Sequence, residues 1–138
     1  MIKLFVFGNG NITFNDFQSY YVHNLNPIII KENVHFLLCD FKGTDTLMME
    51  YLKCLTSNVT IYHIGSKPRY IPDLFKTKVN DWLFMGGFNS DKERDSAAIN
   101  NCTHYLAFDF NSDKNRKSGT LKNIETCHLF NKIFLPSD

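Results

Sequence analysis

The sequence predicts an α/β protein with a Rossmann-like, three-layer α/β/α fold and a mostly parallel sheet of about five strands. Short apolar runs alternate along the chain with segments whose apolar residues recur at helical spacing. Several of these runs stop at a turn that contains glycine. In a chain of 138 residues, repeated strand–helix units require a parallel sheet with helices on both faces and right-handed crossovers. Because the chain has no repeat, low-complexity tract or linker, residues 1–138 are predicted to form a single domain.

The first half of the chain predicts three strands separated by two helices. Residues 2–7 form a short apolar run that ends at a glycine-containing turn, and residues 34–39 and 59–64 repeat this pattern. Between the first two strands, aromatic and leucine residues from position 14 to position 25 recur at helical spacing. Thr44 can cap the second helix, whose apolar residues follow the same period.

The second half begins with a long irregular stretch, residues 66–89, which is uncommon in a compact domain and often serves as a lid or binding loop. Its aromatic residues can either stack on a ligand base or anchor the loop to the core; these are Trp82, Phe84 and Phe88. The pair Ser90 and Glu93 is a capping box that predicts a helix over residues 91–101. A strand at 104–110, a helix capped by Ser118 and a closing strand at 132–135 complete the pattern.

Composition excludes several function classes. The chain has 15 Lys and Arg against 14 Asp and Glu, a net charge of +1, which argues against nucleic-acid binding because phosphate contacts need a broad basic face. The four cysteines form no CxxC pair and the histidines show no ligand spacing, so no metal site is predicted. No apolar run reaches 18 residues, so we expect no membrane span. We expect a cytoplasmic protein with reduced thiols.

Glycines cluster where the predicted strands meet the helices, at the edge of a parallel sheet where ligands bind. Gly8 and Gly10 follow the first strand and Gly43 follows the second. Strand-to-helix turns also need glycine for conformational reasons alone, so both interpretations stay open for each residue. Thr13 breaks the G-x-G-x-x-G pattern and no GxxxxGK[ST] motif is present, which argues against a dinucleotide dehydrogenase and a P-loop enzyme.

The segment Ser118-Gly119-Thr120 is the sharpest candidate site. A helix that starts here offers hydroxyl and backbone N–H groups to an anion, and the helix dipole adds to the attraction. Three cations precede it, at Lys114, Arg116 and Lys117. The alternative interpretation is an ordinary helix cap preceded by solvated charges.

Four short segments, taken in order, resemble the SLOG superfamily, a Rossmann-like group related to the DprA and LOG proteins, and in particular its small stand-alone phage and bacterial members. These segments are 8–10 (Gly-Asn-Gly), 39–45 (Cys-Asp-Phe-Lys-Gly-Thr-Asp), 94–95 (Arg-Asp) and 118–124 (Ser-Gly-Thr-Leu-Lys-Asn-Ile). The resemblance covers about residues 1–135. It implies binding of a nucleotide or a nucleotide-derived signal, such as an ADP-ribose compound or a cyclic nucleotide, through Gly8, Asn9, Gly43, Asp45, Arg94, Ser118, Gly119 and Thr120. The residues themselves add Gly10, Asp40, Arg69 and Asn123 as ligand-binding candidates.

The last segment also resembles nucleoside 2-deoxyribosyltransferases, which carry S-G-T-x-x-E with the glutamate as nucleophile. Asn123 stands at that position here, and an amide cannot carry a covalent sugar intermediate. Glu125 lies two positions further on, on another side of the helix. The LOG pattern PGGxGTxxE is also incomplete.

The pattern therefore favours a binding protein, a sensor or a sequestering protein such as a phage anti-defence factor, over an enzyme. The alternative is an N-glycosidic-bond enzyme that uses Asp45, Asp95 or Glu125. Neither hypothesis needs a cofactor. The superfamily resemblance also implies a homo-oligomer.

Overall fold

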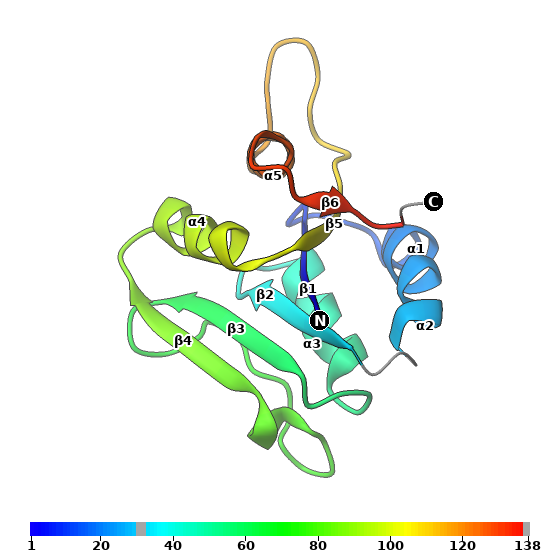
Figure 1. The fold of residues 1–138 in the computed structure, drawn as a ribbon, viewed down its shortest axis with the longest axis vertical. Helices are drawn as coiled ribbons and strands as arrows, with labels where there is room; N and C mark the ends of the chain where they lie inside the picture. Colours follow the sequence, from blue (N-terminus) through cyan, green and yellow to red (C-terminus); the bar gives the residue numbers. More distant parts are fainter. Residues whose placement is uncertain (30–32, 137–138) are drawn as a thin grey trace.

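A computed structural model, which describes residues 1–29 and 33–136, has a six-stranded sheet in the order β4-β3-β2-β1-β5-β6 (Figure 1). Every strand pair is parallel. The Rossmann-like α/β class is confirmed, with one strand more than predicted. The strands are β1 (Ile2–Gly8), β2 (Val34–Cys39), β3 (Val59–Ile64), β4 (Leu83–Phe88), β5 (His104–Phe108) and β6 (Ile133–Phe134).

Helices cover both faces of the sheet. The segment predicted as one helix is a continuous run of α1 (Phe14–Asp16), the π-helical η1 (Phe17–Val22) and α2 (His23–Ile29). This run and α3 (Thr44–Leu52) pack on one face, and α4 (Asp91–Asn101) and α5 (Gly119–Leu129) pack on the other. Among the described residues, no helix has the length and apolar character that a membrane span requires.

Side-chain alternation along β1 divides the core into two layers. Leu4 and Val6 join the cluster on the side of η1, α2 and α3, whereas Phe5 and Phe7 join the cluster on the side of α4 and α5. Three of the four cysteines are buried as small core residues, but Cys54 is exposed.

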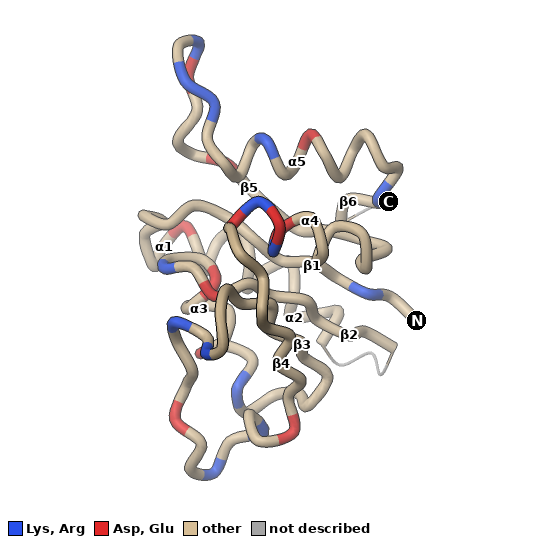
Figure 2. The backbone as a smooth tube through the Cα atoms, turned by 90° about the vertical axis from the view of Figure 1, so that its left-hand side faces the viewer, with Lys and Arg blue, Asp and Glu red and all other residues tan. Residues whose placement is uncertain are grey.

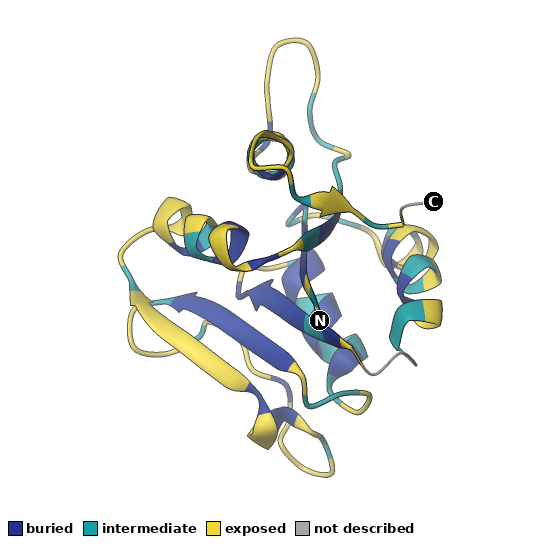
Figure 3. Cartoon of the chain, in the orientation of Figure 1, coloured by how far each residue is buried: buried dark blue, intermediate teal, exposed yellow. Residues whose placement is uncertain are grey.

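The predicted irregular stretch 66–89 contains β4, which pairs with β3 at the edge of the sheet. Five of its six residues are exposed (Figure 3), and Gly86 and Gly87 lie inside it. An exposed, glycine-containing edge strand has no buried apolar alternation, which is why the sequence pattern does not predict it. Trp82 anchors the preceding loop to the core, because its buried indole N–H donates to the Thr56 carbonyl at 2.9 Å.

Local capping signals place two of the helix starts as predicted. The Ser90 hydroxyl accepts from the Glu93 N–H at 3.1 Å, and the Ser118 hydroxyl accepts from the Leu121 N–H at 3.0 Å. The start of α3 differs, because its cap residue is Gly43 and the Thr44 hydroxyl donates to the Asn9 carbonyl instead.

Candidate functional site

A cavity of about 320 Å³ lies at the carboxyl ends of the strands, beside the point where the chain order in the sheet reverses between β1 and β5. Nine of the twelve predicted site residues line it: Gly8, Asn9, Gly10, Asp45, Arg94, Ser118, Gly119, Thr120 and Asn123. Asp40, Gly43 and Arg69 do not line it. The fold therefore brings together residues from β1, α3, α4 and α5 that lie far apart in the sequence.

Gly43 does not line the cavity, but it lets the start of α3 approach the backbone of Asn9 and Gly10, which do line it. Its φ is +80°, and a Cβ built on it would lie 2.6 Å from the Asn9 carbonyl oxygen and from the Gly10 Cα. The Thr44 N–H and hydroxyl both donate to the same Asn9 carbonyl, at 3.2 and 3.0 Å. Only glycine combines this backbone conformation with this contact.

We expect Gly43→Ala to lower the free energy of unfolding by about 1–3 kcal/mol, because the variant combines a strained backbone with a steric overlap. Gly65→Ala is the matched control, since Gly65 also has a positive φ, +66°, but a Cβ there meets nothing within 4 Å. Urea denaturation measures both. A cost for Gly43→Ala no larger than that for Gly65→Ala would show that the loop contact contributes nothing.

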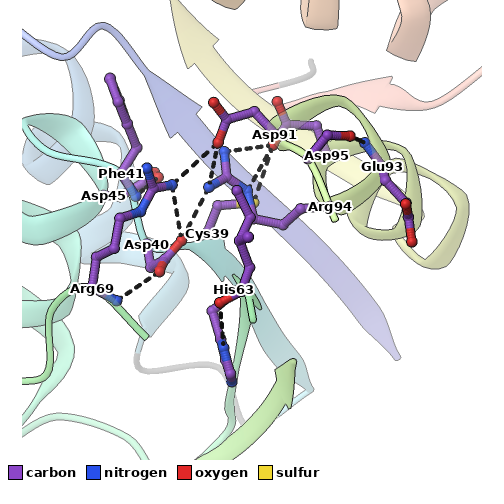
Figure 4. Close-up of polar contacts among 12 residues, drawn as sticks. Cys39, Asp40, Phe41, Asp45, His63, Arg69, Asp91, Glu93, Arg94 and Asp95 are labelled. Atoms are coloured by element: carbon purple, nitrogen blue, oxygen red, sulfur yellow. Dashed lines mark hydrogen bonds and ion pairs between the residues drawn. The ribbon is translucent and has the colours of Figure 1, made fainter. Parts of the chain in front are cut away.

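Arg94 lines the cavity, but its guanidinium is engaged by three carboxylates (Figure 4). Nη1 lies 3.0 Å from Asp40 Oδ1 and 3.1 Å from Asp91 Oδ1, and Nη2 lies 3.0 Å from Asp95 Oδ1. The family resemblance implies that Arg94 binds the ligand. In the structure the Arg94 guanidinium also contacts the buried carboxylate of Asp40, which follows the last residue of β2, so the protein itself provides the countercharge for this side chain.

Arg69 joins the same network from outside. Its guanidinium contacts Asp40 at 3.3 Å and Asp91 at 3.2 Å, and it stacks over the Phe41 ring at 5.4 Å. Arg69, a predicted ligand-binding residue, does not line this cavity, but it contacts Phe41, which does.

Asn9 and Ser118 use their side chains to join β1, β5 and α5. The Asn9 amide donates to Asp109 at 3.0 Å and to Thr120 at 3.3 Å, and its oxygen accepts from the Phe110 N–H. The Ser118 hydroxyl donates to the same Asp109 oxygen at 2.7 Å. These polar groups are thus satisfied within the protein.

Asp109 is a site-building residue that the sequence reasoning missed. Burial would raise its pKa, but hydrogen bonds from Ser112, Asn9 and Ser118 lower the pKa to about 2. The sequence does carry a signal for Asp109, because an acid that directly follows a strand lies at the edge of the sheet. The predicted strand extended to residue 110 and so contained Asp109, whereas β5 ends at Phe108.

Gly119 and Thr120 begin α5 and line the cavity. The N–H groups of Gly119 and Thr120 have no acceptor among the described residues. Lys117 pairs with Glu125 at 2.8 Å, whereas Arg116 lines the cavity and its guanidinium forms no ion pair in the described part of the chain. Figure 2 shows the segment before α5 projecting from the body of the molecule with these cations along it. An anion at this helix start would meet two N–H groups, the helix dipole and one guanidinium.

Asp45 and Asn123 form part of the cavity wall. Asp45 is only 5% exposed; its Oδ2 accepts from the Phe41 N–H at 2.9 Å, and its Oδ1 has no hydrogen-bond partner among the described residues. Burial raises the pKa of Asp45 to about 7. Asn123 donates to Asp95 Oδ2 at 3.0 Å, so its amide orients a carboxylate. The described residues contain no group of three or more metal-ligating side chains.

Comparisons with protein-family models, with curated proteins and with solved structures found no match to this chain.

Proposed function

We propose that this protein binds a nucleotide or a nucleotide-derived signalling molecule in the cavity at the carboxyl edge of the sheet, as a sensor or a sequestering protein. The observation that carries the proposal is the helix start at Gly119 and Thr120, which line the cavity and whose N–H groups have no acceptor among the described residues. Arg116 and Asp45 line the same cavity, and Asp45 Oδ1 has no hydrogen-bond partner in the described part of the chain. The resemblance to the SLOG superfamily, as one of its small phage or bacterial members, supports the same ligand class.

The volume of the cavity favours a ligand of mononucleotide size. Its volume of about 320 Å³ is at the lower end of the range for small-molecule sites, roughly 300–1,000 Å³. A phosphate fits the start of α5, and the aromatic rings of Phe5, Phe7 and Phe41 line the cavity as apolar surface for a base.

We expect anionic mononucleotides, and not the matching nucleosides, to raise the melting temperature. At a ligand concentration about 100 times the dissociation constant, the stabilisation is about 2.7 kcal/mol. A thermal-shift panel of nucleosides, mononucleotides, cyclic nucleotides and ADP-ribose compounds measures this. A panel in which no compound moves the transition would overturn the proposal.

The role of the helix start is tested by Gly119→Pro against Gly119→Ala. Proline at the first helical position removes the N–H but suits the backbone, and Ser118, with φ −70° and ψ 162°, has the conformation that a residue before proline prefers. Alanine keeps the N–H, and a Cβ at this position meets nothing within 4 Å. We expect the proline variant alone to bind nucleotides about tenfold more weakly, the loss of one charge-assisted hydrogen bond.

An N-glycosidic-bond enzyme is the second candidate, on one observation. The Asp95 carboxylate lines the cavity and is oriented by Arg94 on one oxygen and by Asn123 on the other. Chromatography of nucleotides and nucleosides after incubation with the protein tests this hypothesis. Free base released by the wild type and abolished in Asp95→Asn would replace the binding proposal with the enzyme.

A further inference from the structure

We propose that Asp45 recognises the ribose of the bound nucleotide, so that the cavity selects ribonucleotides over deoxyribonucleotides. This inference rests on the proposed function, because it assigns one part of the same ligand to one side chain. The structural observation behind it is separate from the phosphate site: a cavity-lining residue has a buried carboxyl oxygen that no described group of the protein satisfies.

The two oxygens of Asp45 have different surroundings. Oδ2 accepts the Phe41 N–H at 2.9 Å, which fixes the carboxyl group in the first turn of α3. Oδ1 is buried and has no partner, and it is the only side-chain nitrogen or oxygen among the described residues identified in this condition. A buried acceptor without a donor is costly, and folded proteins satisfy nearly all such groups. Since Asp45 lines the cavity, a hydrogen-bond donor on the ligand can satisfy Oδ1.

Arg94 does not fill this role, although it lies close enough to influence the charge of Asp45. Its guanidinium contacts Asp40, Asp91 and Asp95. Arg94 therefore does not donate to Asp45 Oδ1, which has no donor among the described protein groups and can take one from a ligand.

The donors of a nucleotide are its ribose hydroxyls and the ring N–H and amino groups of its bases, because an ionised phosphate only accepts. A carboxylate also only accepts, so the base edge that it matches best has two neighbouring donors, such as N1–H and the amino group of guanine, and that match uses both carboxylate oxygens. Oδ2 is already used by Phe41, so only one oxygen of Asp45 is available. One carboxyl oxygen has two lone pairs and can accept from both hydroxyls of a vicinal diol. The arrangement therefore favours ribose over the base.

The test is titration calorimetry of AMP, GMP, CMP and UMP and of their 2′-deoxy counterparts against the wild type, Asp45→Asn and Asp45→Ser. At pH 8, where Asp45 is ionised, we expect every ribonucleotide that binds to lose about tenfold to a hundredfold in affinity when the 2′-hydroxyl is removed, the range for a hydrogen bond to a charged group. In both variants the ribose preference should fall to within about twofold. Asp91→Asn is the matched control: Asp91 is another cavity-lining carboxylate, with a side chain 60% exposed, and its variant should keep the preference.

The outcomes separate this inference from the proposed function. Nucleotides that bind equally well with and without the 2′-hydroxyl, or a preference that survives in both Asp45 variants, would overturn the ribose assignment and leave nucleotide binding intact. A preference for CMP over UMP that disappears in Asp45→Asn would assign Oδ1 to a base amino group instead. If no compound binds at all, both proposals fall.

Discussion

Arg94→Ala is expected to lower the free energy of unfolding by about 3–5 kcal/mol, the usual cost of removing one partner from a buried ion pair. The Arg94 side chain is 5% exposed, and the Asp40 carboxylate that it contacts at 3.0 Å is fully buried. Without the guanidinium this carboxylate loses its buried countercharge. Urea denaturation monitored by circular dichroism measures the loss.

Arg69→Ala is the matched control for this prediction, because Arg69 contacts the same Asp40 oxygen at 3.3 Å from a side chain that is 44% exposed. We expect it to cost no more than about 1 kcal/mol, as exposed ion pairs do. Equal costs for the two variants, or a cost below 1 kcal/mol for Arg94→Ala, would show that the buried network is not what stabilises this edge of the sheet.

Asp45 is expected to make the protein less stable as the pH rises from about 4 to about 8. Burial raises its pKa from 3.8 to about 7. The folded chain therefore holds this proton in a pH range where the unfolded chain has released it, so the free energy of unfolding falls through this window. The gap between the two pKa values corresponds to about 4 kcal/mol.

The Asp45→Asn variant isolates this contribution, since asparagine keeps an acceptor for the Phe41 N–H but does not titrate. The stability of the variant relative to the wild type should rise by about 4 kcal/mol between pH 4 and pH 8. Gly119→Ala, which alters another cavity-lining residue and places a Cβ where nothing lies within 4 Å, should follow the wild-type pH profile. A difference between Asp45→Asn and wild type that stays constant with pH would contradict the prediction.

The elements that the sequence predicts well are those whose signals are local. The capping box at Ser90 predicts α4 with the bounds that the structure shows, and Ser118 caps α5 as expected. β1, β2 and β3 are apolar runs buried on both faces. Each of these signals lies within a few residues of the element that it marks.

The roles of individual site residues are less accessible to sequence reasoning, because they depend on partners far away in the chain. Asn9 donates to Asp109 across 100 positions, and Arg94 donates to Asp40 across 54. A glycine-rich turn and a helix start predict where a ligand can bind, but not which of their polar side chains already bind each other. The side chains of Asn9 and Arg94 thus have hydrogen-bond partners within the protein, whereas Asp45 keeps an oxygen with no partner among the described residues.

The sequence by itself determined the α/β class and the gathering of its glycine-containing turns and helix starts at one edge of a parallel sheet. Those features follow from short-range periodicity and from the parallel direction of the strands. Only the tertiary structure decided the strand order, the presence of β4 and the division of the polar residues into structural and open groups. The physical reason is that a hydrogen bond or ion pair satisfies a buried group only where a second element brings its partner within about 3 Å, and that depends on how the whole chain packs.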